Sequence, residues 1–544
     1  MSYPNKAELY GYLDLNPFAT VDEIHKHFLY TGKNPTRRKK RLSKAVGKWL
    51  TRREAIDLNK ETVQEPVIGG VIEAPEDVRG WASGTTFIFT SAQANTHLNE
   101  KFWNNLMHFA EVRDAQVHIS RFTYNKAQFG KKSVKPDADT TGDDDDIWFD
   151  PRIEPYISDE QIQIADGLIW CGELNIIPTR VDPINGFENY GRGASVIIPH
   201  TKMAMKSVPT MKDSPARFAY STGTVTARNY IEKAAGQKAS LHHVYGALLV
   251  EVDEDGTWFA RQLNADNDGT IYDLNQRFGL NENGKIGVTE SRVRVLTHGD
   301  LHGNKVNRSV LRTMEKVIDV LHPEHQVFHD TIDFQPRNHH NIKDSHFLHQ
   351  MLMEGKDVVE DEFKYIAILM GRHLARPDTR HHIVTSNHDQ AVEGWLRNVS
   401  GFNDPVNLKT WLMLNLYCVQ SREDGKKPRP FWNLLSKFLP KQYNWQIVHE
   451  DDSLVIAGIE HGLHGHLGPN GARGSPKNLR TVGKANTGHT HSAGIVEGVY
   501  TAGVFGDLDM GYNKGLSGWS HSFIVTYQNG KRAIMTIKNR KAWR

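Results

Sequence analysis

Five apolar, strand-like runs in the second half of the chain each lead into residues that bind metals or move protons. A carboxylate and an imidazole two residues apart at a strand end can both point into one site. In α/β folds and layered sheets, active sites form at this end of the strands. The runs and the motifs that follow them are Arg292–Thr297 with Asp300-Leu-His302, Val317–Val320 and Gln326–Phe328 with Asp330-Thr-Ile-Asp333, His382–Thr385 with Asn387-His388-Asp389, Ser453–Ile459 with His461-Gly-Leu-His464-Gly-His466, and a fifth run with Gly488-His489-Thr-His491.

The composition supports metal chemistry with nitrogen and oxygen ligands. The chain has 28 histidines, concentrated between Leu296 and His491, but only two cysteines, Cys171 and Cys418, without CxxC spacing. This pattern excludes a disulfide framework and a thiolate zinc site. Mixed nitrogen and oxygen ligands favour manganese, iron or zinc over a copper or iron–sulfur centre.

In this order, the motifs D-x-H, D-x-x-D, N-H-D, H-G and G-H-x-H resemble those of the calcineurin-like metallophosphoesterase superfamily, over residues 291–544. The resemblance implies a four-layer α/β/β/α sandwich that holds two divalent ions, with Mn²⁺ preferred and Fe²⁺, Zn²⁺ or Mg²⁺ as alternatives. It also implies hydrolysis by in-line attack of a metal-bridging hydroxide on phosphorus. Asp300, His302, Asp330 and His491 match one metal site, and Asp330, Asn387, His489 and a histidine of the fourth motif match the other.

Further roles follow from the same resemblance. His388 matches the histidine that stabilises or protonates the leaving oxygen, and Asp333 matches the carboxylate that orients this histidine. The fourth-motif ligand stays open between His461, which is nearest the strand end, and His464, which begins an H-G-x sequence. The second motif departs from the family pattern, because His329 stands where the family has glycine.

The motifs also discriminate among classes of phosphoesterase. Protein serine/threonine phosphatases have Arg-Gly after D-x-x-D and Glu after N-H, whereas here Phe334 and Asp389 follow. DNA-repair nucleases of the superfamily share N-H-D and G-H-x-H. The segments His464–Ser475, Thr90–Thr96 and GDLDMGYNKGLSGWSH resemble phage-encoded DNA nucleases of the pre-early, host-DNA-degrading or DNA-transfer type. This resemblance implies a phage early protein in the cytoplasm of the host cell.

The rest of the chain suggests two further domains, which makes the expected fold class α/β. We expect residues 1–78 to form a small basic helical module, like a winged helix or helix-turn-helix, that contacts DNA. Residues 79–290 form a middle α/β domain with a β-α-β unit from Thr85 and a hairpin with a type I′ turn at Asp255-Gly256. Residues 291–544 form the nuclease domain. The candidate DNA-binding residues are Arg37, Arg38, Lys39, Lys40 and Arg41 in a basic helix, and Arg473 and Lys477 in a glycine-rich loop between two metal motifs.

The leading hypothesis is a dinuclear metal-dependent DNA nuclease that hydrolyses phosphodiester bonds. The alternatives are a phosphomonoesterase or cyclic-nucleotide phosphodiesterase, and a DNA-binding early protein whose metal site is structural. DNA is the expected partner, and we expect a homo-oligomer. No apolar run approaches the roughly 18 residues of a membrane span, and the N-terminus lacks the pattern of a signal peptide, so we expect a cytoplasmic protein.

Overall fold

The computed structural model describes residue 9 and residues 85–124, 147–212, 214–338 and 341–544. The chain divides into two compact units. One comprises Met1–Val71 and Leu352–Gly355, and the other comprises Ile72–Met351 and Lys356–Arg544 and contains every sheet. The basic module predicted for residues 1–78, with its candidate DNA-binding residues, lies outside the described residues except for Leu9.

The predicted β-α-β unit begins the described part of the chain. β1 (Thr86–Gln93) pairs in parallel with β2 (Gln116–Phe122). The helix between them, α4 (Glu100–Val112), begins at Asn99, whose side chain accepts a hydrogen bond from the Phe102 backbone N–H. β8 (Gly246–Val252) and β9 (Trp258–Asn264) complete a sheet of order β2-β1-β8-β9.

The turn between β8 and β9 differs from the prediction. A type I′ turn requires a positive φ at both central residues. Gly256 has a φ of 81°, but Asp255 is not in the left-handed region. The Asp253 backbone N–H donates to the Thr257 carbonyl, and the Gly256 N–H donates to the Asp253 carbonyl. The hairpin therefore closes through three residues, with glycine alone in the left-handed conformation, and the type I′ prediction is wrong.

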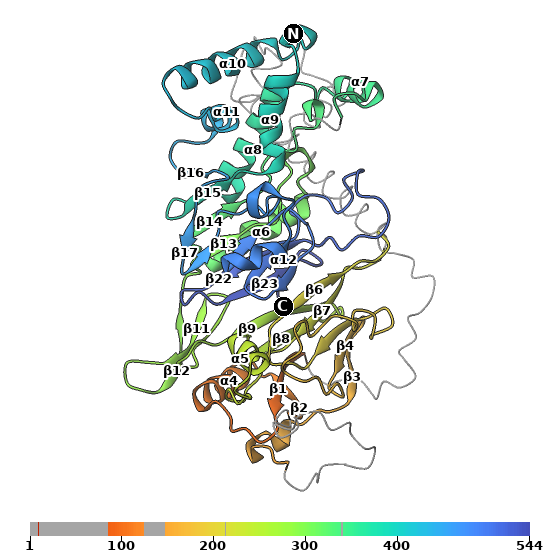
Figure 1. Cartoon of the computed structure of the whole chain (residues 1–544), viewed down its shortest axis with the longest axis vertical. Coiled ribbons are helices and arrows are strands. Elements are labelled where there is room, and N and C mark those ends of the chain that lie inside the picture. The colour runs from red at the N-terminus through yellow and green to blue at the C-terminus, as the bar shows by residue number, and fades with distance from the viewer. Residues whose placement is uncertain (1–8, 10–84, 125–146, 213, 339–340) are drawn as a thin grey trace, which may run out of the picture. The chain divides into compact units, whose positions relative to one another are not determined.

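A six-stranded sheet carries the first three metal motifs. Its order is β16-β15-β14-β13-β22-β23, as Figure 1 shows. β13 to β16 are parallel to one another, so their carboxyl ends lie at the same edge. β22 is antiparallel to β13, and β23 is antiparallel to β22. The strands are β13 (Val295–Thr297), β14 (His325–Phe328), β15 (Arg380–Val384), β16 (Asn444–Val448), β22 (Ser522–Thr526) and β23 (Arg532–Thr536).

One part of the second predicted run is helical. Val317–Val320 lies near the end of α6 (Arg308–Leu321), and β14 begins only at His325. The buried residues of α6 include Val310, Met314 and Val317, which recur at helical spacing. The strand interpretation of Val317–Val320 was therefore wrong, because the window was too short to distinguish the two periods.

A ten-stranded sheet joins residues from both sides of the predicted boundary at 290. β6 pairs with β20 through Met205 and Ile495. The division into domains at residues 78 and 290 stays a prediction. In sheet order the strands are β17 (Val455–Ile456), β18 (Ile459–Glu460), β19 (Ala485–Thr487), β21 (Val499–Thr501), β20 (Gly494–Val496), β6 (Met205–Val208), β7 (Arg217–Ser221), β5 (Ser195–Ile198), β4 (Leu168–Cys171) and β3 (Gln161–Ala165).

One apolar core connects these three sheets. It contains Phe89 from β1, Trp170 from β4, Tyr220 from β7 and Ile524 from β22, each at most 1% exposed. β23 and β9 are edge strands of the six-stranded and four-stranded sheets, and the Ile534 N–H of β23 donates to the Gln262 side chain of β9. The burial of apolar surface therefore couples the middle region to the region with the metal motifs.

The remaining elements complete a mixed α/β fold, as the sequence predicted. None of the helices in the described part of the chain combines the length and the apolar composition that crossing a bilayer requires. A fourth sheet consists of β10 (Ile271–Asp273), β11 (Gln276–Leu280) and β12 (Ile286–Glu290), and the other α-helices are α5 (Ala234–Leu241), α7 (Ser345–Met353), α8 (Val359–Leu369), α9 (Asn387–Asn398), α10 (Leu408–Glu423), α11 (Pro430–Phe438) and α12 (Pro476–Leu479).

A buried ion network ties β8, β9 and β10 together. The guanidinium of Arg261, which is 1% exposed, lies 2.6 Å from Glu251 Oε2 and 2.6 Å from Asp273 Oδ1. Arg113 of the turn after α4 also pairs with Asp273, at 2.8 Å. Each carboxylate is therefore neutralised inside the fold.

We predict that Arg261→Ala lowers the free energy of unfolding by about 3–5 kcal/mol, because it leaves two buried carboxylates without their main cation. Chemical denaturation measures the change. The matched control is Arg121→Ala, which removes an exposed pair with Asp159 and should cost less than about 1 kcal/mol. Equal losses for the two variants would contradict this account.

Candidate metal centre

Three metal motifs begin where adjacent parallel strands end. Asp300 follows β13, Asp330 follows β14, and Asn387 begins α9 after β15. Backbone hydrogen bonds continue the pairing beyond the strands, since the His302 N–H donates to the Asp330 carbonyl at 2.7 Å. The fourth and fifth motifs follow β18 and β19 of the ten-stranded sheet, and they reach the same place.

Four side chains of the first predicted metal site converge. Ligand atoms of Asp300, His302, Asp330 and His491 all lie within 4.8 Å of one another, and all four residues are buried. His491 Nε2 is 3.1 Å from Asp300 Oδ2, and His302 Nε2 is 3.7 Å from Asp330 Oδ2. Two carboxylates and two imidazoles in this arrangement can hold a divalent metal ion.

Residues of the second predicted site also gather at Asp330. His464 Nε2 is 3.5 Å from Asp330 Oδ2 and 3.2 Å from Asn387 Oδ1. The rings of His464 and His489 have centroids 5.2 Å apart. Asp330 Oδ2 therefore lies close to His302 and to His464, which is compatible with the bridging role that the sequence predicted and that stays a prediction.

The structure separates the two candidate histidines of the fourth motif. His461 lies beside Asn486, with 3.4 Å between His461 Nδ1 and Asn486 Nδ2, whereas His464 contacts Asp330. The third histidine of the motif, His466, lies 3.2 Å from the Gln390 amide. The H-G-x alternative from the sequence therefore agrees better with the geometry than the residue nearest the strand end.

Several polar atoms at the centre are buried without a hydrogen-bond partner in the described part of the chain. They include Asp300 Oδ1, Asp330 Oδ1, His464 Nδ1 and His491 Nδ1. Polar atoms in this state are costly unless something satisfies them. A cation would offset the proximity of the two carboxylates, so this donor set fits a metal ion.

The titration behaviour of these groups also fits a cation site. Burial, followed by the charge of Asp330, raises the pKa of Asp300 well above its ordinary value. Burial alone would raise the pKa of Asp330 as well, but His464, His388 and His302 lower it well below its usual range. Burial lowers the pKa of His491 to about 4, which keeps this imidazole in the neutral form that binds metals.

The backbone is strained at four of the candidate ligands. His302, Asp330, His489 and His491 have φ angles of 51°, 45°, 72° and 57°, in the left-handed region that non-glycine residues rarely adopt. Such conformations cost about 1–3 kcal/mol each and cluster at functional sites. The strained residues are therefore those whose side chains converge at the centre.

Gly488 allows the fifth motif to approach the first. A Cβ atom on Gly488 would lie 2.1 Å from Asp300 Oδ1 and 3.2 Å from the Cβ of His329. The next residue donates its backbone N–H to Asp300, with 2.7 Å between His489 N and Asp300 Oδ2. Any side chain at position 488 would therefore displace the Asp300 carboxylate.

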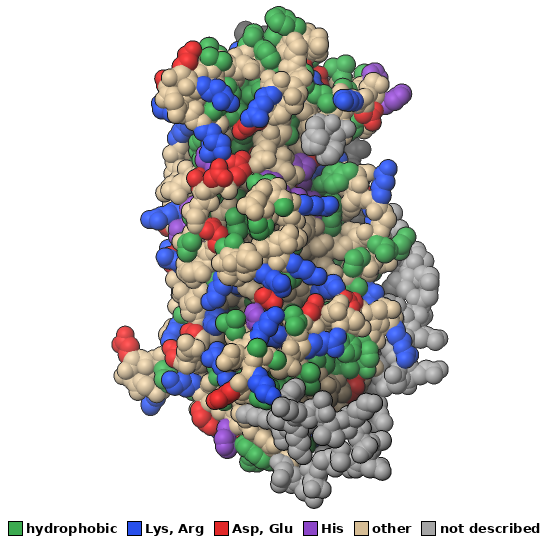
Figure 2. All heavy atoms as spheres, viewed as in Figure 1, with side chains coloured by type: hydrophobic (Ala, Val, Ile, Leu, Met, Phe, Trp, Pro, Cys, Tyr) green, Lys and Arg blue, Asp and Glu red, His purple; other side chains and the backbone are tan. Residues whose placement is uncertain are grey.

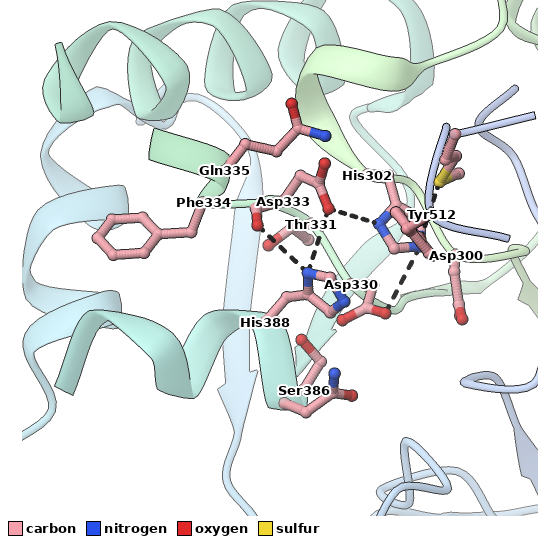
Figure 3. Close-up of polar contacts among 12 residues, drawn as sticks. Asp300, His302, Asp330, Thr331, Asp333, Phe334, Gln335, Ser386, His388 and Tyr512 are labelled. Carbon is pink, nitrogen blue, oxygen red and sulfur yellow. Dashed lines mark hydrogen bonds and ion pairs between the residues drawn. The ribbon is translucent and has the colours of Figure 1, made fainter. Parts of the chain in front are cut away.

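His388 and Asp333 form a pair at the edge of the centre. His388 Nδ1 is 3.2 Å from Asp333 Oδ1, which is also 3.3 Å from His302 Nδ1, as Figure 3 shows. Burial lowers the pKa of His388, but the charges of Asp330 and Asp333 outweigh this effect and raise it to about 10. Without bound metal, the imidazole therefore favours the protonated form, which is the form that a general acid requires.

Two supporting residues escaped the sequence analysis. Glu362 of α8 accepts hydrogen bonds from the backbone N–H groups of Asp333 and Phe334, at 2.7 and 3.0 Å. Nothing in its local sequence signals this role, because Glu362 lies 29 residues beyond Asp333. Ser386 caps α9 in a capping box with Asp389, which places Asn387 and His388 in the first helical turn. The S-x-x-D spacing could have revealed this cap.

His329 occupies the position where the metallophosphoesterases have glycine. Its φ lies outside the left-handed region, so the backbone there accepts a side chain without strain. The ring is fully buried, both of its nitrogens lack a hydrogen-bond partner within the described residues, and its centroid is 5.5 Å from that of His464. Burial lowers its pKa to about 4. His329 therefore packs as a neutral ring behind His464.

The described candidate DNA-binding residues lie beside the fourth motif. Arg473 and Lys477 are both exposed. The Gly474 N–H donates to the His466 carbonyl, which anchors their loop to the centre. Whether these residues contact DNA stays a prediction, and the candidates at positions 37–41 lie outside the described residues.

We predict that Gly488→Ala weakens Mn²⁺ binding roughly 10- to 100-fold, because the added methyl group displaces Asp300. Isothermal titration calorimetry measures the affinity. Gly394→Ala in α9 is the matched control, since a Cβ there meets no atom within 4 Å. Unchanged Mn²⁺ affinity in the Gly488 variant would show that Asp300 is not a ligand.

We also predict that His464→Ala lowers the content of bound Mn²⁺, whereas His461→Ala leaves it unchanged. The reason is that only His464 of these two contacts Asp330 and Asn387 among the described residues. Elemental analysis of the purified variants measures the content. The reverse order of losses would assign His461 as the ligand.

Comparison with known proteins gives one extensive match. The chain is 36% identical over 503 residues to Protein A1 of Escherichia phage T5, and the alignment covers 88% of this chain and 86% of that protein. No family model matches the chain, and no solved structure matches it. Identity at this level across most of both sequences shows common descent, so the chain belongs to the family of phage T5 Protein A1.

Proposed function

We propose that this protein is a metal-dependent DNA nuclease with a metallophosphoesterase sandwich in residues 291–544. The observation that carries the proposal is the position of Asp330 between two ligand groups, with the His388–Asp333 pair beside it. Membership of a phage protein family supports a role in the infected cell, and we propose degradation of host DNA as that role.

Two groups of residues would each hold one of the two metal ions. Asp300, His302, Asp330 and His491 would hold one ion, and Asp330, Asn387, His464 and His489 the other. Two bound divalent ions would supply Lewis-acid stabilisation of the phosphoryl oxygens and activation of water, with Mn²⁺ as our first choice.

His388 would act on the leaving group. A protonated imidazole can donate to the oxygen that leaves the phosphorus, which avoids the release of an unstable alkoxide. Asp333 would keep the ring oriented through its contact with Nδ1, so that Nε2 carries the proton to be donated. Glu362 would hold Asp333 through the backbone of its loop.

DNA would be held by cations close to the centre. Arg473 and Lys477 extend from the loop that follows the fourth motif, and phosphates attract such residues regardless of sequence. On the face drawn in Figure 2, Lys and Arg side chains alternate with Asp and Glu, in keeping with a net charge of +2. The proposed binding of DNA therefore depends on Arg473, Lys477 and the basic segment at positions 37–41, and not on a uniformly basic face. A homo-oligomeric state stays a prediction.

The test is digestion of supercoiled and linear plasmid by the full-length protein with Mn²⁺, Mg²⁺ or EDTA. We expect cleavage with metal only, and we expect Asp330→Asn to lower the rate at least about 1,000-fold while DNA binding persists, because both ligand groups lose their shared charge. Asp378→Asn, which alters an exposed carboxylate, is the control and should cleave normally.

The other outcomes select other functions. Hydrolysis of p-nitrophenyl phosphate without cleavage of DNA would identify a phosphomonoesterase. Tight DNA binding without hydrolysis of any phosphate ester in Mn²⁺ would identify a binding protein with a structural metal site. Either result would overturn the nuclease proposal.

A further inference from the structure

Two aromatic side chains of the C-terminal segment lie beside the metal centre. The indole of Trp519 packs edge-on against His491, with ring centroids 4.2 Å apart. Tyr512 follows, with its centroid 6.0 Å from that of Trp519. In Figure 3, Tyr512 lies next to His302 and Asp300. Neither aromatic residue belongs to a metal motif.

Both ends of the loop that carries this pair are attached to the centre. At its start, the Phe505 N–H donates to the Asp300 carbonyl, and the Asp507 N–H donates to the Lys305 carbonyl. At its end, the Ser520 N–H donates to the His491 carbonyl. The loop therefore holds the aromatic rings in a defined position relative to two candidate ligands.

The loop exposes apolar surface at this position. Tyr512 is 50% exposed, and its neighbours Leu508 and Leu516 are 41% and 64% exposed. The Tyr512 hydroxyl donates to the thioether of Met510 at 3.1 Å, so the polar end of the side chain is satisfied within the loop. Trp519 is partly exposed as well, and a partly exposed aromatic pair is a surface for a flat ligand.

We propose that Tyr512 and Trp519 form a stacking platform for an unpaired nucleobase next to the scissile phosphate. The inference rests on the proposed nuclease function and narrows its substrate to single-stranded DNA or frayed duplex ends. Every base has a π-face, so such a platform needs no sequence preference. Bases inside a duplex are already stacked on each other and cannot reach it.

The surrounding charge suits the same ligand. Lys514, two residues after Tyr512, is exposed and can attract the phosphates of a strand whose base lies on the platform. Lys212 pairs with Asp509 at 2.9 Å and thereby connects the loop to the middle region. Aromatic rings next to cations are the usual surface of proteins that bind single strands.

The test measures binding of fluorescent strands to the full-length protein by anisotropy, in Ca²⁺ to limit cleavage. One strand is oligothymidylate, and the other is an abasic strand of equal length with the same phosphates. We expect the wild-type protein to bind oligothymidylate about tenfold more tightly than the abasic strand. Tyr512→Leu and Trp519→Leu should reduce this ratio toward one, while Tyr512→Phe should preserve it.

A matched variant and a second readout separate the explanations. Leu241→Ala removes an exposed apolar side chain outside this loop and should retain the ratio. Equal binding of the two strands by the wild-type protein would overturn the platform. The platform would also be overturned if both leucine variants kept the wild-type ratio of affinities and Trp519→Leu lost bound Mn²⁺. In that case the Trp519 ring would serve to position His491. A retained ratio in a protein that cleaves no DNA would support the platform and refute the nuclease.

Discussion

The burial of Asp300 and Asp330 is the constraint on which the rest of this site depends. Two carboxylates that lie close together in a dry interior repel each other, and burial disfavours the charge on both. The chain surrounds them with imidazoles from four separate motifs. The parallel order of β13, β14 and β15 brings the first three motifs to one edge, and the fourth and fifth motifs reach it from the ten-stranded sheet. A divalent cation would complete the balance of charge, so this cluster is compatible with a metal site.

The fold gives up local stability to build this centre. Four candidate ligands have left-handed backbones, and within the described residues the buried ring nitrogens of His329 and Nδ1 of His464 lack hydrogen-bond partners. The fold tolerates these costs because many contacts in the surrounding structure hold the strained residues in place. Strand pairing continues into the ligand loops, Glu362 holds the Asp333 loop, and one apolar core joins the sheets of both halves of the chain.

Local patterns predicted a large part of this arrangement. The β-α-β unit from Thr86, the strands β13, β14 and β15, and the ligand motifs at their ends follow from apolar runs and polar termini. The prediction failed where a short window was ambiguous, as for Val317–Val320 in α6, and where turn geometry depended on one φ angle, as at Asp255. Glu362 reaches the centre from α8, which carries no motif, so no local signal could identify it.

The sequence by itself determined which chemical groups are available, because the order and spacing of histidines and carboxylates after strand-like runs do not depend on packing. It also determined the mixed α/β class. Only the tertiary structure decided that His464 rather than His461 lies against Asp330, and that strands before and after residue 290 share a sheet. Both outcomes depend on contacts between residues far apart in the chain, and spacing along a sequence carries no information about which distant partner a side chain meets.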